Sequence, residues 1–181
     1  AFAKDFLAHC VYALSEMGMN RLRGRSGMQE AGRVAALRFI DAIERLAPEA
    51  GTAHAVRGVV HWIEAQPQKR GEKRDAAGME KAAAAFGKAG EREPGHAWAL
   101  NNLGATYTDL GEWEESEHWF ARSVAIDSSV KSINNVATAQ INQGKLDEAE
   151  ATLDLADRWA PGGERSLNTR YALEMNRENW V

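Results

Sequence analysis

The feature that most constrains this chain is a pattern of small and large apolar residues that repeats after about 33 residues in its C-terminal half. In the segment 97–129 the pattern consists of Leu100, Leu103, Gly104, Tyr107, Gly111, Trp113, Ser116, Phe120, Ser123 and Ile126. In the segment 130–163 it consists of Ile133, Val136, Ala137, Gly144, Leu146, Ala149, Leu153, Ala156 and Pro161. Small residues at helical spacing let two helices approach closely, while large residues fill the neighbouring grooves. The pattern therefore predicts helix pairs that become stable by stacking on one another.

Both segments resemble tetratricopeptide repeats. In that family a first helix carries a Leu-Gly step followed by an aromatic residue, as Leu103, Gly104 and Tyr107 do here. The resemblance is clearest over residues 97–163 and weaker over residues 28–96. It implies an all-α protein, an α-solenoid of antiparallel helix pairs that forms a tetratricopeptide-like superhelix of about nine helices.

We expect a single tetratricopeptide-like domain over residues 1–181, because each helix pair buries its apolar face only against its neighbours. The expected parts are a divergent N-terminal helix pair at 2–48, a repeat at 51–96 with a loop insertion near 66–75, repeats at 97–129 and 130–163, and a C-terminal capping helix at 164–181.

One expected helix departs from the family pattern. His54 and His61 occupy positions that the resemblance assigns to the core, whereas Val56 and Val60 lie on the apolar stripe of the helix. Either this helix is rotated in its pair, or its apolar face lines the groove and is covered by another segment or by a ligand. Of these alternatives we favour packing against the helix expected at 2–19.

Composition and charge narrow the classes of partner. Of the 181 residues, 44% are hydrophobic and 27% are charged, and the formal net charge is −4. No run approaches the ~20 apolar residues of a membrane span, so we expect none. Residues 1–90 carry 14 Lys and Arg against 10 Asp and Glu, whereas residues 91–181 carry 8 against 16. The overall excess of acidic residues nevertheless argues against a nucleic-acid partner. The single cysteine leaves the compartment open between the cytoplasm, which we favour, and a bacterial periplasm.

Two basic segments, at 21–25 and 69–74, are the alternative binding site. They could grip the phosphates of RNA or an acidic protein tail. No aromatic residue is interleaved with either segment, so the stacking platform typical of single-stranded nucleic-acid binding is missing. We interpret both as solvated loops.

The family resemblance implies that first helices line a concave groove in which a partner peptide or helix lies. The matching positions are Trp98, Asn101, Asn102, Asp109, Lys131, Asn134, Asn135, Thr138, Asn142, Arg165 and Asn168. Two Asn-Asn pairs recur 33 residues apart, at 101–102 and at 134–135. An amide side chain offers a donor and an acceptor, as a peptide bond does, so such a ladder could hold a peptide main chain. The alternative is that these amides cap turns or bond adjacent helices to one another.

Signatures of catalysis are missing from the sequence. His54 and His61 stand two helical turns apart, about 10.5 Å, which is too far to share one metal ion. Cys10 is the only cysteine, and no Gly-rich phosphate loop precedes a helix. The run of carboxylates at 112–117 is typical of a solvated helix face. We therefore expect no enzymatic activity, no metal site and no cofactor.

The sequence thus predicts a protein-interaction scaffold that binds a peptide or helix of a partner protein in its groove. Two other roles stay open at this point. One is a regulatory or targeting module of a larger enzyme or assembly, and the other is self-association into a homo-oligomer through the end helices or the groove.

Overall fold

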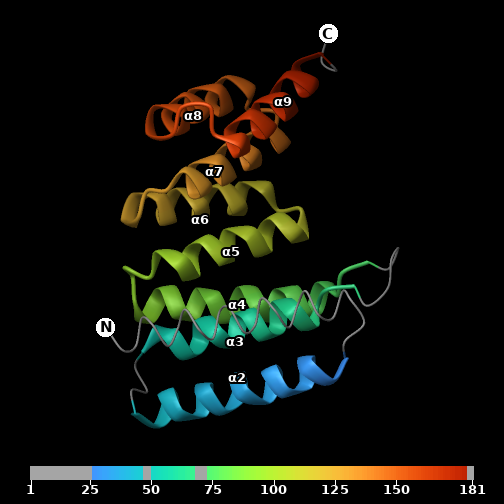
Figure 1. The fold of residues 1–181 in the computed structure, drawn as a ribbon, viewed down its shortest axis with the longest axis vertical. Coiled ribbons are helices and arrows are strands. Elements are labelled where there is room, and N and C mark those ends of the chain that lie inside the picture. The colour runs from blue at the N-terminus through green and yellow to red at the C-terminus, as the bar shows by residue number, and fades with distance from the viewer. Residues whose placement is uncertain (1–25, 47–49, 68–72, 179–181) are drawn as a thin grey trace. The chain divides into compact units, whose positions relative to one another are not determined.

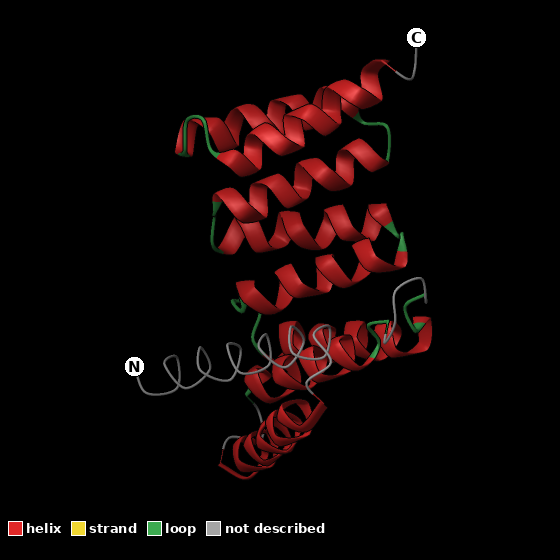
Figure 2. Ribbon diagram, turned by 45° about the vertical axis from the view of Figure 1, so that its right-hand side comes forward, coloured by secondary structure: helices red, strands yellow, loops and turns green. Residues whose placement is uncertain are grey.

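The computed structural model describes residues 26–46, 50–67 and 73–178, and in these ranges it contains eight helices and no strand (Figures 1 and 2). The helices are α2 (Ser26–Leu46), α3 (Gly51–Glu64), α4 (Ala76–Arg92), α5 (Ala97–Leu110), α6 (Trp113–Ile126), α7 (Val130–Asn142), α8 (Leu146–Trp159) and α9 (Glu164–Glu178). The helix expected at 2–19 lies outside the described residues. The predicted fold class, an all-α solenoid of helix pairs, is confirmed.

The chain divides into two compact units, Ala1–Pro94 and Gly95–Val181. The first contains α2, α3 and α4, and the second contains α5 to α9. We describe each unit by itself. The expected single domain over residues 1–181 stays a prediction.

In the first unit the apolar stripe of α3 is buried. Val56 and Val60 form a core cluster with Ile40 of α2, so α2 covers part of the stripe. On the same helix His54 and His61 are half-buried. The helix expected at 2–19, which was the favoured partner of this stripe, lies outside the described residues.

A glycine sets the spacing between α3 and α4. A Cβ on Gly58 would lie 2.8 Å from a ring carbon of Phe86, so only a residue without a side chain permits this approach. Both residues are buried, and Phe86 is 1% exposed. The insertion expected near 66–75 falls between these two helices in the sequence, and its residues 68–72 lie outside the described residues.

The second unit repeats this arrangement twice. In the α5–α6 pair a Cβ on Gly104 would lie 2.8 Å from the ring of Phe120. In the α7–α8 pair the small residue is Ala137 and the large one is Leu153, and both are fully buried. Leu173 of α9 joins the same core cluster. The small positions of the sequence pattern are therefore the points at which paired helices touch.

Glycines also end the first helices of both pairs. Gly111 follows α5 with a φ of 81°, and Gly144 lies just after α7 with a φ of 77°. These left-handed conformations are accessible to glycine at little cost. After each glycine the next backbone N–H bonds a carbonyl of the preceding turn, Glu112 to Tyr107 at 2.9 Å and Lys145 to Gln140 at 3.0 Å. This geometry reverses the chain into the second helix.

Candidate functional site

The residues predicted to line the groove lie on α5, α7 and α9, the first helices of the second unit. In this unit α7 contacts both α5 and α9, so the three helices are neighbours. On α7, Lys131, Asn135, Thr138 and Asn142 recur at the spacing that places them on one side of a helix. We call the surface formed by this stripe and the predicted residues of α5 and α9 the first-helix face.

An amide pair links two of these helices. The Nδ2 of Asn135 on α7 donates a hydrogen bond to the Oδ1 of Asn101 on α5, at 3.2 Å. Both side chains are half-buried. The sequence repeat aligns Asn135 with Asn102, but the structure pairs it with Asn101. One amide hydrogen of Asn135 and both amide hydrogens of Asn101 take no part in this bond.

Asn134 has a different environment. It is 1% exposed, and its Nδ2 donates to Val130 O at 2.7 Å and to the Oγ of Ser166 on α9 at 3.2 Å. Its Oδ1 is buried and has no hydrogen-bond partner. In this structure Asn134 therefore does not offer its amide at the surface. Its contacts match the alternative left open by the sequence, in which the amide bonds adjacent helices.

The other predicted residues of α5 are half-buried. The Nδ2 of Asn102 donates to the carbonyl oxygen of Trp98, one turn earlier, at 2.8 Å. The Trp98 ring lies beside His96, with ring centroids 6.0 Å apart. Asp109 is also half-buried. Asn102 thus bonds its own helix through its amide nitrogen, and its predicted role in holding a partner main chain stays a prediction.

The remaining predicted residues are exposed. They are Lys131, Thr138, Asn142, Arg165 and Asn168. Two of them bond their own helix, because the Thr138 hydroxyl donates to Asn134 O at 2.9 Å and the Asn142 amide donates to Thr138 O at 2.8 Å. The first-helix face is therefore polar and carries exposed cations on α7 and α9, at Lys131 and Arg165.

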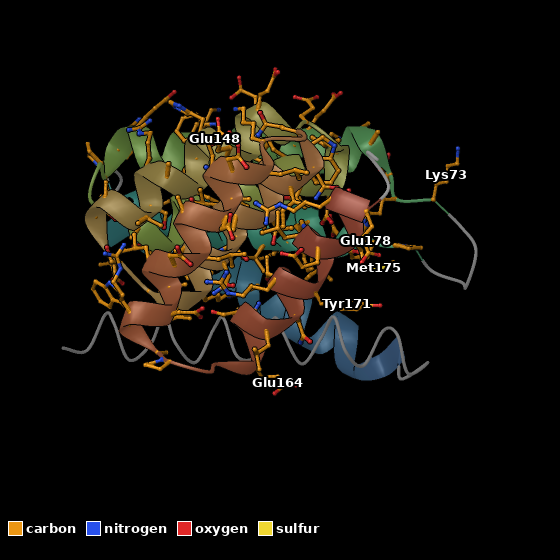
Figure 3. All side chains as sticks on the ribbon, turned by 90° about the horizontal axis from the view of Figure 1, so that it is seen from above. Lys73, Glu148, Glu164, Tyr171, Met175 and Glu178 are labelled. Carbon is orange, nitrogen blue, oxygen red and sulfur yellow. The ribbon has the colours of Figure 1, made fainter. Side chains whose placement is uncertain are left out.

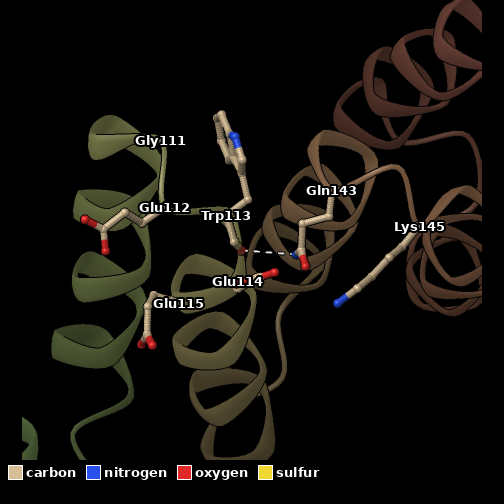
Figure 4. A pocket seen from close by; sticks show the side chains of 7 residues that line it. All are labelled: Gly111, Glu112, Trp113, Glu114, Glu115, Gln143 and Lys145. Atoms are coloured by element: carbon tan, nitrogen blue, oxygen red, sulfur yellow. Dashed lines mark hydrogen bonds between the residues drawn. The ribbon is translucent and has the colours of Figure 1, made fainter.

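A pocket of about 450 Å³ lies away from this face. Its lining residues come from the turns after α5 and α7 and from the first turn of α6, and they are Gly111, Glu112, Trp113, Glu114, Glu115, Gln143 and Lys145 (Figure 4). The Nε2 of Gln143 donates to the carbonyl oxygen of Trp113 at 3.1 Å. This bond joins the first residue of α6 to the residue that follows α7.

A carboxylate that accepts three side-chain hydrogen bonds lies beside this pocket. The side chain of Glu117 accepts hydrogen bonds from Gln140 at 2.9 Å, from Gln143 at 2.8 Å and from Lys145 at 2.7 Å. Burial alone would raise the pKa of Glu117, but these three donors outweigh it and hold the pKa below its ordinary value. The expected solvated carboxylate run at 112–117 is thus wrong at this position, because α7 and the turn that follows it supply donors from more than twenty residues away in the sequence.

One side of α9 carries a row of apolar residues that was not among the predicted site residues. There Leu167, Tyr171 and Met175 are large apolar side chains at the surface, with exposed fractions of 57%, 69% and 41%. Their spacing of four residues is a signal that the sequence analysis passed over. Within the described ranges no group of three or more His, Cys, Asp or Glu residues is placed to hold a metal ion. None of the described helices is long and apolar enough to cross a bilayer.

Residues 96–126 match the family model described as tetratricopeptide repeat. The chain carries a tetratricopeptide repeat. The matched repeat spans α5 and α6, with the contact of Gly104 and Phe120 at its centre. The predicted resemblance to the tetratricopeptide family is thereby confirmed.

Solved tetratricopeptide structures share the fold at low sequence identity. A tetratricopeptide protein of Thermus thermophilus is 18% identical, with a TM-score of 0.59 over 82% of this chain and 78% of its own. The second tetratricopeptide domain of human RPAP3, solved with an HSP70 peptide, is 18% identical, with a TM-score of 0.57 over 69% of this chain and 98% of its own. The Yersinia enterocolitica secretion chaperone SycD, solved with a peptide of the translocator YopD, is 19% identical, with a TM-score of 0.51 over 59% of this chain and 85% of its own. A comparison with curated protein sequences finds no match.

Proposed function

We propose that this protein is an interaction scaffold that binds an extended segment of a partner protein along the first-helix face of its second unit. The observation that carries the proposal is the bond between Asn101 and Asn135, which places two amide side chains side by side on neighbouring helices. Amides recognise a peptide main chain whatever its side chains are, because they both donate and accept hydrogen bonds.

Exposed groups around this pair supply further contacts. Thr138 and Asn142 continue the stripe of α7, and Asn168 extends it on α9. Lys131 and Arg165 are exposed cations, so a segment with net negative charge is favoured. Each neutral hydrogen bond contributes only about 1 kcal/mol net, so binding needs several rungs together with an apolar contact. Trp98 is the aromatic residue of this face that can provide one.

Two structural neighbours support the proposal. The human RPAP3 domain and the Yersinia SycD chaperone were each solved in complex with a peptide. Their chains share a fold with this one, and we propose that the first-helix face likewise binds a polypeptide. A scaffold of this kind requires no chemistry at the site, in keeping with the expected absence of catalysis.

The proposal is tested by selecting binders from a displayed library of random linear peptides against the protein. The best peptide is then titrated against the double variant Asn101→Ala with Asn135→Ala. We expect its affinity to fall about tenfold or more, because two rungs are lost, while the melting temperature changes little. Glu148→Ala, an exposed change on the second helix α8, is the matched control and should leave affinity unchanged.

Two results would contradict the proposal. One is an affinity that the double variant leaves unchanged, and the other is a loss of binding that Glu148→Ala reproduces. Light scattering at several protein concentrations distinguishes self-association from binding of a partner. A protein that stays monomeric at every concentration does not self-associate. The alternative of a module within a larger assembly uses the same face, and it is compatible with the same binding result.

A further inference from the structure

The last helix, α9, has two opposite faces of different character. Its inner face packs on α7 and α8 through Leu173, which is fully buried. Its outer face carries the α9 stripe, which we define as Leu167, Tyr171 and Met175. These residues stand four apart, so they follow one side of the helix over about 12 Å. Tyr171 and Met175 lie on the same side of α9, with Glu178 beyond them (Figure 3).

The earlier first helices of this unit place a second helix against their apolar residues. Phe120 of α6 covers Gly104 of α5, and Leu153 of α8 packs with Ala137 of α7. On α9 the three apolar side chains of the stripe are 41% to 69% exposed instead. Monomeric proteins seldom leave large apolar residues in a row at the surface, and such rows mark interaction sites.

The charges around the stripe are unevenly placed. Glu164 and Glu178 stand three residues before and three residues after its ends, and both are exposed. Two arginines of the same helix, Arg170 and Arg177, point to α8, whereas Arg165, next to Glu164, is exposed. Arg170 bonds Asp154 and Asp157 at 2.7 and 2.8 Å, and Arg177 bonds Glu150 at 2.7 Å.

The outer face of α9 is therefore an apolar row with a carboxylate at each end. Because Arg170 is held by two aspartates of α8, its charge is directed to the inner side of α9. Any partner that buries the stripe must also meet Glu164 and Glu178. Buried or half-buried carboxylates are costly without a cation beside them, so the partner has to supply that cation.

We propose that the α9 stripe binds a basic amphipathic helix of a partner protein. That helix carries apolar residues three or four positions apart and Lys or Arg at both ends of the apolar row. A helix fits because the row is straight and its side chains have the spacing into which the ridges of a second helix pack. The basic ends of this helix neutralise Glu164 and Glu178, which gives the contact its orientation and its partner choice.

The same charges disfavour a second copy of this chain as the occupant. In an antiparallel pair of α9 helices, Glu164 of one copy would meet Glu178 of the other. In a parallel pair, each glutamate would meet its own counterpart. Both arrangements place like charges together at each end of the apolar row.

The test is a selection from a displayed library of helical peptides of about 16 residues, or about four turns, with all surface positions randomised. The protein is the bait, and the variant Tyr171→Asp is used for counter-selection. We expect the enriched peptides to share an apolar row and Lys or Arg at both of its ends. Enriched peptides with acidic or neutral ends, or no enrichment over the counter-selection, would overturn the proposal.

The best peptide is then labelled, and its affinity is measured by fluorescence anisotropy. Tyr171→Ser should weaken binding about tenfold or more, because an aromatic anchor at the centre of an interface carries much of the affinity. The double variant Glu164→Gln with Glu178→Gln should weaken binding and also reduce its salt dependence. Ile126→Ser is the matched control, since Ile126 is 43% exposed on α6.

Further outcomes count against the proposal. An affinity that Tyr171→Ser leaves within twofold of the parent, or an equal loss with Ile126→Ser, would overturn it. So would a dimer in sedimentation that Tyr171→Ser dissociates, because the occupant would then be a second copy. The variant Asn101→Ala with Asn135→Ala should leave this binding unchanged, which separates the α9 stripe from the amide pair on α5 and α7.

Discussion

Gly104 of α5 lies so close to Phe120 of α6 that a Cβ on residue 104 would come within 2.8 Å of the phenyl ring. The same relationship joins Gly58 of α3 to Phe86 of α4, at the same distance. In the α7–α8 pair the corresponding small and large residues are Ala137 and Leu153. Where alanine takes the place of glycine, leucine takes the place of phenylalanine. The summed volume of the two side chains therefore sets the distance between paired helices.

We expect Gly104→Ala to lower the free energy of unfolding by about 1–2 kcal/mol. Overpacking against the ring costs about 1–3 kcal/mol, and the better helix propensity of alanine recovers up to about 1 kcal/mol. The added change Phe120→Leu should restore part of the loss, because it creates the alanine–leucine pair that α7 and α8 already use. Urea denaturation of both single variants and the double variant measures the coupling. Strictly additive effects would show that the two side chains do not compete for space.

The two kinds of asparagine should respond differently to truncation. Asn134→Ala should destabilise the protein by about 1–2 kcal/mol. The buried amide of Asn134 donates to the Ser166 hydroxyl, and the substitution removes this bond. Asn101→Ala with Asn135→Ala should cost about 0.5 kcal/mol, because both side chains are half-buried and water can replace their bond. Chemical denaturation compares them directly. Equal losses would assign a structural role to both kinds.

The stability contributed by Glu117 should depend on pH. Its pKa in the folded protein is below the ordinary value of 4.5, so the unfolded chain binds more protons near that pH. Its contribution is therefore fully present above pH 4.5 and is lost as the pH falls through the folded-state pKa. Glu117→Gln should cost about 1 kcal/mol at neutral pH, and this cost should shrink in acid. Glu114→Gln, an exposed change on the same helix, is the control. A cost that is the same at both pH values would contradict the role given to the charge.

Arg170 should hold α9 against α8. It bonds Asp154 and Asp157 at once, so Arg170→Gln removes two charge-assisted contacts. We expect amide hydrogen exchange in α9 to become faster, while α5 and α6 keep their protection, because the contacts are local to the last helices. The loss of stability should be about 1 kcal/mol and should decrease at high salt. Unchanged exchange in α9 would show that Leu173 and its apolar neighbours hold the helix alone.

The helix pairs could be predicted because their signals are local. Gly104 and Ala137 mark the contacts between helices, and the glycines at 111 and 144 mark the turns. A residue that must be small, or that must adopt a positive φ, leaves few alternatives in the sequence. These positions therefore predict the helix pairs from the sequence alone.

The asparagines of the first-helix face could be predicted as a set, but not in their individual roles. Successive residues on a helix point about 100° apart, so the rotation of α7 about its axis decides which of Asn134 and Asn135 faces α5 and which is buried against α9. The repeat aligned Asn135 with Asn102, and the structure paired it with Asn101. The hydrogen bonds of Glu117 could not be predicted for the same reason, because its three donors come from α7 and the turn that follows it.

The sequence by itself determined the helical pairs, their close contacts and their turns, because steric size and backbone conformation act between near neighbours in the chain. Only the tertiary structure decided the rotation of each helix. That rotation buried Asn134, joined Asn101 to Asn135 and left Tyr171 at the surface of α9. The rotation of a helix depends on its packing against all neighbouring side chains at once, and no local sequence pattern specifies that packing.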